Sequence, residues 1–575
     1  MKKIFSLVSC VLLFSCTRVT PDDGPKKPTI DSVSLELSNV TATTAIFSGH
    51  LDVDASLLPA SQVILYYSDA ETFNFDTSQS VSVTLFDNNQ NFTISLTDLK
   101  YNTKYNYCVV LDISSEKITG NVLEFTTGNI SLNLSLDAVT ETTARISGIV
   151  EGLSESDKSI IEVGVAYSSD EGKVQNGEGT ILPASEIPPN GVLSFTLSDL
   201  ESGITYYYCS YVKQGETYVY GSVLSCHTIE QVFSLLPAAN CFIVSEGGTY
   251  KFNTVKGGSD TSVGKVASAT VLWESFGTSS VLAVGDLIKS VSCKNGYITF
   301  QTADTFKEGN AVIAAKDVDG NILWSWHIWL TDQPEGQVYN NDAGILMDRN
   351  LGATSVTPGE VQALGLFYQW GRKDPFLGSS SISSSTSRAK STINWPKSVK
   401  SDQTSGTIEY AIANPTTYIS YNDNYDWHYT GTSTVDNTRW TESSSPKSIY
   451  DPCPAGWRVP DGGREGLWVK ANDKNITVKY HEVGRGMNMN GKFSPVTMVW
   501  YPAAGFLNVD GVLVYVSSHG RCWSATPYIY GTNTYGNEAS CLHFANNNDV
   551  FMMEKNSRAN SLSVRCIQEV NQVKE

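Results

Sequence analysis

Aromatic rings interleaved with amides and carboxylates are the residues of this chain best suited to binding chemistry. The run YNDNYDWHYTGTSTVDNTRW, residues 421–440, contains five such rings: Tyr421, Tyr425, Trp427, Tyr429 and Trp440. Flat rings cover the apolar faces of a sugar, while neighbouring amides and carboxylates bind its hydroxyls. The same side chains serve as rigid anchors in protein recognition. We predict that this loop binds a glycan or a protein; the alternative is that half of the rings pack beneath long loops.

A second run, TPYIYGTNTYGN, covers residues 526–537 and offers Tyr528 and Tyr530 as further ligand contacts. Two Asn-rich runs, residues 422–424 and 546–549, carry oxygen atoms of the kind that calcium prefers. Asn and Asp also tolerate the left-handed backbone conformation, so both runs are predicted to be turns. No metal and no cofactor is predicted.

Enzyme signatures are missing from the sequence. It contains no Gly-x-Ser-x-Gly elbow, no His-Glu-x-x-His, no phosphate-binding loop and no dinucleotide fingerprint. The seven histidines are scattered, with no pair at metal-ligand spacing. A pair of glycosidase carboxylates is recognised by a distance, which sequence does not provide. The prediction is a non-catalytic protein, with a glycan-active hydrolase as the enzymatic alternative.

Cysteines offer disulfide chemistry if the chain is exported. None of the eleven is arranged as Cys-x-x-Cys, so a zinc ribbon or a thioredoxin-type site has no support. Cys522 and Cys541 each lie in a strand-like run, CWSA and SCLHF. They are candidates for a cross-strand disulfide, and two buried thiols are the alternative.

The N-terminus has the pattern of a secretory signal. Lys2 and Lys3 precede an apolar run, residues 4–14, that is too short to span a bilayer. With Leu13 and Ser15 before it, Cys16 resembles the lipobox cysteine of bacterial lipoproteins. The resemblance implies that residues 1–16 are a signal peptide with its lipobox and that Cys16 carries the lipid. Residues 17–29 then form a polar, Pro-containing tether.

Length and composition favour several β domains over a helical bundle. The 575 residues are too many for one core, and 45 glycines with only 17% charged residues indicate loop-rich β architecture. The formal net charge is −19. An acidic chain repels phosphate backbones, so a nucleic-acid partner is excluded from the prediction.

An internal repeat defines the N-terminal half. TATTAIFSG recurs as TETTARISG, LKYNTKYNYCVV as LESGITYYYCSY, and GNVLEFTT as GSVLSCHT, each about one hundred residues later. Each copy alternates apolar and polar residues in short runs, the pattern of an antiparallel sandwich. Leu99 followed by Tyr105, and Leu200 followed by Tyr206, resemble the tyrosine corner of fibronectin type III domains. Residues 30–128 and 129–229 are therefore predicted to be two fibronectin III-like domains of the Ig-like sandwich class.

Residues 230–332 are predicted to form a third β-sandwich. Asp319 and Gly320 lie between two apolar strands, which predicts a hairpin with a type I′ turn. Trp324 and Trp326 share one face of the second strand and Trp329 lies on the other. We expect core packing plus one exposed ring rather than a sugar platform.

The C-terminal segment, residues 333–575, contains a set of ordered phrases: MDRNLGA, FYQWGRKDPF, YDPCPAGWRVP, VWYPAAGF, CWSATP and LSVRCIQE. Together they resemble the Fibrobacter succinogenes major paralogous domain family, which occurs in surface proteins of the Bacteroidetes group. The resemblance implies an irregular α+β fold similar to C-type lectins and to the formylglycine-generating enzyme. C-type lectin folds commonly tie their early helical region to the last strand, which implies a disulfide between Cys453 and Cys566.

These inferences predict a multidomain, mainly β lipoprotein of the outer membrane, exposed at the cell surface. Thr17, rather than Asp, follows Cys16, which argues against inner-membrane retention, and Asp22-Asp23 weakly resembles a surface-export signal. The expected partners are the membrane, through the lipid, and a glycan or a surface protein. The expected role is adhesion or recognition, with a fimbrial association considered. The alternative is glycan capture for a polysaccharide-utilisation system. The sequence makes no prediction of oligomeric state.

Overall fold

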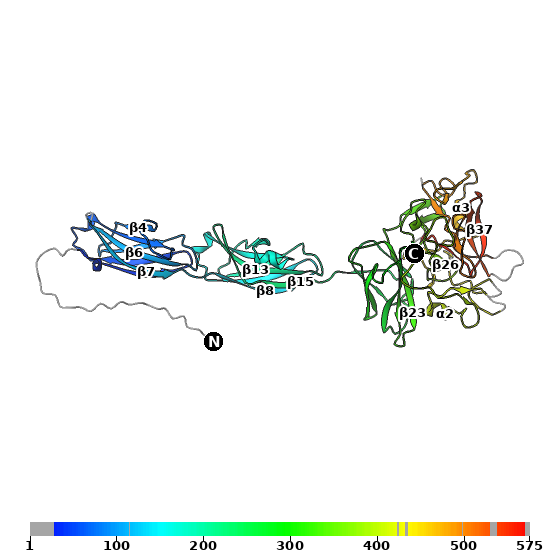
Figure 1. Cartoon of the computed structure of the whole chain (residues 1–575), viewed down its shortest axis with the longest axis horizontal. Coiled ribbons are helices and arrows are strands. Elements are labelled where there is room, and N and C mark those ends of the chain that lie inside the picture. The colour runs from blue at the N-terminus through cyan, green and yellow to red at the C-terminus, as the bar shows by residue number, and fades with distance from the viewer. Residues whose placement is uncertain are drawn as a thin grey trace. The chain divides into compact units, whose positions relative to one another are not determined.

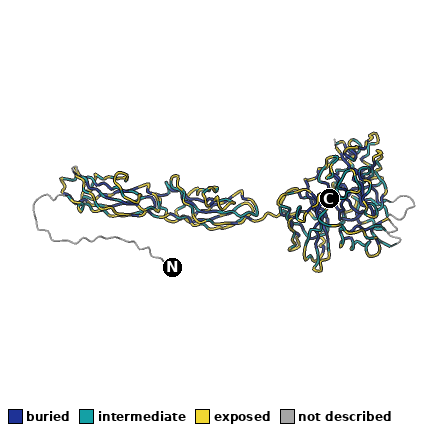
Figure 2. Tube along the Cα trace, viewed as in Figure 1, coloured by how far each residue is buried: buried dark blue, intermediate teal, exposed yellow. Residues whose placement is uncertain are grey.

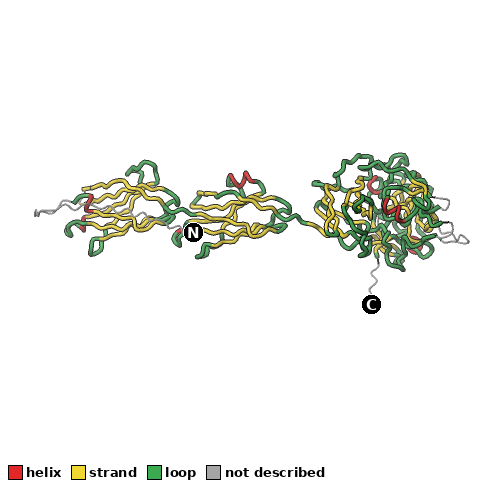
Figure 3. The backbone as a smooth tube through the Cα atoms, turned by 90° about the horizontal axis from the view of Figure 1, so that it is seen from below, coloured by secondary structure: helices red, strands yellow, loops and turns green. Residues whose placement is uncertain are grey.

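Two compact units make up the chain, Met1–Glu230 and Gln231–Glu575. The structure is a computed structural model that describes residues 28–113, 116–421, 425–431, 435–496, 498–528 and 537–569. Cys16, the signal peptide, nearly all of the tether and Tyr530 lie outside the described residues. Strands dominate both units and the helices are short (Figure 3). The predicted multidomain, mainly β fold class is confirmed.

The first repeat is a seven-stranded sandwich of a three-stranded sheet, β1-β2-β5, and a four-stranded sheet, β4-β3-β6-β7 (Figure 1). Alternating apolar and polar residues favour these strands, and along β5 every second side chain is buried. The strand bounds are β1 Val33–Val40, β2 Ala45–Leu51, β3 Ser61–Ser68, β4 Gln79–Val83, β5 Asn91–Leu96, β6 Lys104–Ile113 and β7 Glu116–Thr126.

The second repeat has the same architecture, with sheets β12-β9-β8 and β11-β10-β13-β14, and β15 also pairs with β13. Both repeats contain a fibronectin-type tyrosine corner, near the start of β6 and of β13. The Lys100 backbone N–H donates to the Tyr105 hydroxyl at 2.9 Å, and that of Glu201 donates to the Tyr206 hydroxyl at 3.0 Å. The bounds are β8 Ser131–Val139, β9 Ala144–Glu151, β10 Ile161–Ser168, α1 Glu171–Gln175, β11 Thr180–Pro183, β12 Val192–Leu197, β13 Thr205–Gln214, β14 Thr217–Tyr220 and β15 Leu224–His227.

A buried carboxylate joins the two repeats. Asp157 of the second repeat is fully buried and accepts hydrogen bonds from Thr41 Oγ1 and the Thr43 backbone N–H of the first, both at 3.1 Å. The Thr43 hydroxyl and Ser154 donate to the same carboxylate. These donors favour the charged form and lower the pKa of Asp157 against the effect of burial. The junction therefore depends on one ionised side chain.

Residues 231–330 form a sandwich of two four-stranded sheets, β16-β18-β21-β20 and β17-β23-β22-β19. The predicted hairpin joins β22 to β23. Its turn is not type I′, because Gly320 has a φ of 87° while Asp319 is not in the left-handed region. The bounds are β16 Val232–Ser234, β17 Cys241–Val244, β18 Thr249–Asn253, β19 Ser268–Ser275, β20 Ile288–Lys294, β21 Tyr297–Thr302, β22 Gly309–Lys316 and β23 Ile322–Leu330.

This third sandwich shares a core with the C-terminal region. Trp324 and Trp326 fill the space between its two sheets. Trp329 points from the opposite face of β23 and is also buried, packed in one cluster with Tyr368 and Trp370. The expectation of one exposed ring is therefore wrong, because the C-terminal region covers the outer face of this sheet.

The C-terminal region is built around a seven-stranded sheet, β34-β33-β38-β35-β36-β37 with β26 beside β38. Long loops and two short α-helices surround it in the described part of the region (Figure 3). The bounds of the sheet are β26 Phe367–Gln369, β33 Phe506–Leu507, β34 Leu513–Val514, β35 His519–Pro527, β36 Glu538–Ala545, β37 Val550–Ser557 and β38 Ser561–Ser563. The remaining elements are β24 Gly336–Tyr339, β25 Gly344–Met347, β27 Val399–Lys400, α2 Ile408–Ala413, β28 Ile419–Ser420, β29 Trp457–Arg458, α3 Leu467–Ala471, β30 Tyr480–His481, β31 Gly486–Asn488, β32 Trp500–Pro502 and β39 Ile567–Gln568.

Of the two predicted cysteine pairs in this region, one forms a disulfide and the other does not. Cys453 and Cys566 form a disulfide with a Cα–Cα distance of 6.0 Å. Cys522 and Cys541 are buried free thiols, so the disulfide considered for them is wrong. The register of β35 and β36 pairs Cys522 with Leu542, and Cys541 with the neighbouring Trp523. Since neighbouring residues of a strand point to opposite faces, the two sulfurs lie on opposite sides of the sheet.

Candidate functional site

Two of the predicted ligand contacts are part of the core. Trp427 is 1% exposed and Trp440 is fully buried. Their indole N–H groups donate to the carbonyl oxygens of Trp370, at 2.8 Å, and Tyr450, at 3.0 Å. The prediction that these two rings contact a ligand is therefore wrong, because both belong to the core of Gln231–Glu575. Buried residues of this unit are dark blue in Figure 2.

Arginines pack against Trp427 and the neighbouring Trp370 in this core. The Arg439 guanidinium lies over Trp427, at 4.8 Å from the ring centroid, and over Trp370, at 5.1 Å. Arg558 lies 4.1 Å from the Trp370 centroid. Buried Asp426 balances this positive charge, 2.6 Å from Arg439 Nη2. Trp370 and Trp427 thus pack against buried cations, a structural use of cation–π contact.

The tyrosines of the same loop remain available at the surface. Tyr425 is 57% exposed and its ring stacks on Tyr421, with centroids 5.6 Å apart. Its φ is 58°, and its carbonyl oxygen accepts a hydrogen bond from the Ala559 backbone N–H. Tyr429 and Tyr528 are half-buried. Ligand binding by these four tyrosines stays a prediction.

A cleft of about 360 Å³ in the C-terminal region is lined by residues of segments far apart in sequence, 376–377 with 388–398 and 507–511, and by Thr416 and Tyr418. Trp395 stands in its wall, half-buried, with its ring 5.5 Å from Trp273 and its indole N–H donating to Ser391 Oγ at 3.1 Å. The volume is within the roughly 300–1,000 Å³ of small-molecule sites.

Polar side chains surround this aromatic wall: Arg388, Lys390, Asn394 and Asp510. Arg388 links the two walls, since its Nη2 donates to the Leu377 carbonyl at 2.8 Å and its Nη1 to that of Gly511 at 3.3 Å. An apolar ring face beside hydrogen-bonding groups suits a ligand with one apolar face and several hydroxyls. We name this site the Trp395 cleft.

The serine-rich run before Arg388 is an ordered loop that positions it. The Ser379 hydroxyl lies within 3.0 Å of the carbonyl oxygens of Ser381, Ser384 and Ser387. An isolated bridge then pairs Ser379 with Arg388. This folded loop therefore fixes where the arginine enters the cleft.

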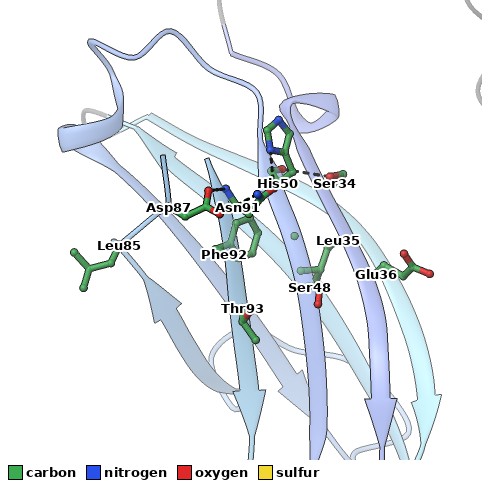
Figure 4. Close-up of a pocket in the computed structure, with 11 residues that line it drawn as sticks. Ser34, Leu35, Glu36, Ser48, His50, Leu85, Asp87, Asn91, Phe92 and Thr93 are labelled. Carbon is green, nitrogen blue, oxygen red and sulfur yellow. Dashed lines mark hydrogen bonds between the residues drawn. The ribbon is translucent and has the colours of Figure 1, made fainter. Parts of the chain in front are cut away.

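A wider groove of about 660 Å³ crosses the first repeat (Figure 4). Its polar rim is already paired, because His50 Nδ1 lies 3.2 Å from Asn91 Oδ1 and Asn91 Nδ2 donates to Asp87 at 3.0 Å. The groove is shallow and presents short polar side chains and the 85% exposed Leu85. Because Phe92 is the single Phe, Tyr or Trp side chain that lines it and is itself buried, the groove lacks the exposed aromatic face that the Trp395 cleft provides.

A buried cysteine–histidine–asparagine array lies where the third sandwich meets the C-terminal region. His327 Nε2–H donates to Asn310 Oδ1 at 2.9 Å, because Asn310 Nδ2 donates to the Gly352 carbonyl. His327 Nδ1 is thereby an acceptor, 3.3 Å from Cys241 Sγ and 3.5 Å from the Tyr368 hydroxyl. Burial lowers the pKa of His327 to about 3 and raises that of Cys241. A sealed thiol beside a neutral imidazole is a structural network, not a nucleophilic site.

His327 makes the stability of Gln231–Glu575 depend on pH. Its pKa is about 6.5 in an unfolded chain and about 3 in the fold. Between these values the unfolded chain binds a proton that the fold excludes. The free energy of unfolding therefore falls as pH decreases, by up to about 1.4 kcal/mol per pH unit from this group. Urea unfolding followed by tryptophan fluorescence between pH 4 and 7 measures this slope.

The control for this prediction is His327→Gln, which does not titrate. His543, whose pKa burial also lowers to about 3, contributes in both proteins, so only the difference in slope belongs to His327. Equal slopes in the two proteins would contradict the prediction.

No sequence signal connected the residues of the Trp395 cleft. The phrase Asn394-Trp395-Pro396, a lone ring in a polar segment ending in proline, was the one local hint. The opposite wall of the cleft, at Asp510, lies more than one hundred residues further along the chain.

The Asn-rich residues 546–549 form the predicted turn, with Asn548 at a φ of 75°.

The described ranges contain neither a metal-ligand cluster nor a membrane-spanning helix. No group of three or more His, Cys, Asp or Glu side chains there is placed to hold a metal ion. Within the same ranges, each helix is too short or too polar to cross a lipid bilayer.

These features define the class: a multidomain, mainly β protein with tandem fibronectin type III-like repeats. No protein family profile matches the chain, and no curated protein matches it. Several solved structures match part of the chain. The FN1–FN3 domains of chicken CNTN1 are 13% identical, the match covering 36% of this chain and 68% of that one, with a TM-score of 0.15. A two-domain fibronectin type III segment of chicken tenascin is 16% identical, covering 34% and 97%, with a TM-score of 0.18.

The sensor domain of the anti-sigma factor RsgI4 in Pseudobacteroides cellulosolvens is 22% identical over 18% of this chain and 74% of that one, with a TM-score of 0.15. Likenesses with TM-scores this low carry no argument about function. The functional proposal depends on the Trp395 cleft.

Proposed function

We propose that this chain is a non-catalytic surface lipoprotein that binds a glycan through the Trp395 cleft. The resemblance of Cys16 to a lipobox cysteine supports an outer-membrane anchor. The fibronectin type III-like repeats are consistent with a spacer between that anchor and the binding region. Adhesion or recognition is the role that these features support together.

The proposal is supported by an aromatic wall that lies beside exposed polar side chains. Trp395 and Tyr418 line the same cleft as Asn394 and Asp510, both of which are exposed. A pyranose has an apolar face that packs on a ring and hydroxyls that an amide and a carboxylate bind. A cleft of about 360 Å³ accommodates a small ligand rather than a protein surface.

Half-buried Tyr421 and exposed Tyr425 form a stacked pair on the other side of a turn that lines this cleft. The turn at residues 508–511 places Asp510 in the cleft, and Val509 in the cluster that holds Tyr421. Tyr421 in turn stacks on Tyr425. The two sides of one turn thus carry aromatic rings, which fits a glycan longer than one sugar.

Trp395→Ala is expected to weaken glycan binding at least tenfold, because the ring supplies the apolar contact; tenfold corresponds to about 1.4 kcal/mol. The full chain would be applied to a glycan array, and the strongest glycan then titrated by calorimetry. Asn394→Ala, which leaves the ring packing intact, is expected to weaken binding by a smaller factor.

Phe551→Ala is the matched control, since that ring is 44% exposed in the same unit and lies outside the cleft. Near-UV circular dichroism would verify that each variant is folded. Unchanged binding by folded Trp395→Ala, or the absence of binding to every glycan, would refute the proposal.

A further inference from the structure

Arg388 is a cation without a carboxylate partner in the described part of the chain. The ion pairs among those residues do not include it, whereas Arg349 pairs with Asp332 and Asp348. Its two hydrogen bonds go to backbone carbonyl oxygens. A guanidinium carries five N–H donors, so three remain beyond these two bonds.

The position of Arg388 in the cleft wall partly desolvates this unpaired charge, which is energetically unfavourable. The side chain is half-buried in the cleft wall, and desolvation lowers the pKa of its guanidinium. A carboxylate brought by a ligand would supply the counter-charge that the protein omits. Arginine suits this role because its planar fork matches both oxygens of a carboxylate.

The charge around the cleft has the sign opposite to that of the whole chain. Arg388 and exposed Lys390 line the cleft against one carboxylate, Asp510, although the chain carries a net charge of −19. An anion is therefore repelled by most of the molecule and attracted at this position. Such a local reversal favours selectivity for charged ligands.

We propose that the Trp395 cleft selects carboxylated glycans, with the sugar ring against Trp395 and the carboxylate on Arg388. This inference rests on the proposed function and specifies its ligand: uronic or sialic acid units rather than neutral sugars. Asp510 binds hydroxyls of the same ligand. Lys390 adds a screened, longer-range attraction.

The test compares matched glycans that differ only in charge or in the carboxylated unit. The probes are trigalacturonic acid against its methyl ester, and sialyllactose against lactose, titrated into the full chain at 50 mM and 500 mM salt. At least one acidic probe is expected to bind ten times more tightly than its neutral partner at low salt. That preference should shrink at high salt, because exposed charges are screened.

Substitutions distinguish the role of Trp395 from that of Arg388. Trp395→Ala should weaken the acidic and the neutral probe alike, whereas Arg388→Gln should remove only the preference for acid. Arg388→Lys, which keeps the charge, should retain part of that preference. Because Arg388 also bonds two carbonyl oxygens, the methyl-ester comparison on the native chain gives the result even if Arg388→Gln does not fold.

The outcomes distinguish the two proposals. Equal binding of acidic and neutral probes, lost in Trp395→Ala, would overturn acid selectivity and leave the glycan-binding function standing. Binding of none of the four probes, together with a silent glycan array, would overturn both.

Discussion

Trp427→Ala is expected to lower the free energy of unfolding of Gln231–Glu575 by about 3–5 kcal/mol, the usual cost of removing a large buried ring. The substitution also removes the indole that the guanidinium groups of Arg372 and Arg439 contact, whose carbons lie 5.6 and 4.8 Å from its centroid. It leaves the Trp370 carbonyl without its indole donor. A cavity beside two buried cations is among the changes a fold tolerates least.

Tryptophan fluorescence during urea unfolding measures this change. All twelve tryptophans of the chain lie in Gln231–Glu575, so the signal reports that unit alone, and eleven remain in the variant. Tyr425→Ala is the matched control, because Tyr425 is two residues away and 57% exposed. It should change stability by no more than about 0.5 kcal/mol. Similar effects of the two substitutions would mean that Trp427 is not a core residue.

Loss of the Cys453–Cys566 disulfide is expected to lower the stability of the same unit by about 2–5 kcal/mol. The bond joins residues 113 apart in sequence, so its removal frees a long loop in the unfolded chain. Both sulfurs are buried among the rings of the central core, which includes Trp440 and Trp523. The double variant Cys453→Ser, Cys566→Ser, compared with the native chain under the same fluorescence assay, gives the magnitude.

Cys293→Ser is the control for this comparison, since that thiol is free and partly exposed in the same unit. It should unfold close to the native midpoint. If a reducing agent shifts the native protein but not the double variant, the effect belongs to the disulfide. A native midpoint that reducing agent leaves unchanged would contradict the prediction.

The sequence predicts those features of the fold whose determining contacts are local or repeated. The tyrosine corner at Tyr105 depends on a residue five positions away, and its copy at Tyr206 appears in the second repeat. Alternation along each strand reports one buried face, so the sandwiches were visible in the pattern. The Cys453–Cys566 pairing came from a resemblance covering the whole C-terminal segment, and the structure contains that bond.

The sequence does not predict the burial of a side chain whose environment is decided by a distant segment. Trp329 is on the outer face of its sheet and is buried only because the C-terminal region covers that face. Trp427 has the composition of a binding loop around it, yet Arg372, one of the two arginines over its ring, comes from outside that loop, and so do Ala411 and Ala559, which pack in the same cluster. The pairing of Cys522 with Leu542 is a matter of register, and a shift of one residue reverses the face of every side chain.

The carboxylate of Asp157 makes the order of the two repeats part of the fold. Residues 58–60, Leu-Pro-Ala, occupy in the first repeat the short 3₁₀ turn that Asp157–Ser159 occupies in the second. The threonines opposite are duplicated, as Thr41 and Thr43 and as Thr140 and Thr142. Exchanging the two modules would move Asp157 away from its threonine donors and set Leu58 against threonine hydroxyls. The repeats are copies in sequence but not interchangeable parts, and concatenating further copies of the first would not reproduce this joint.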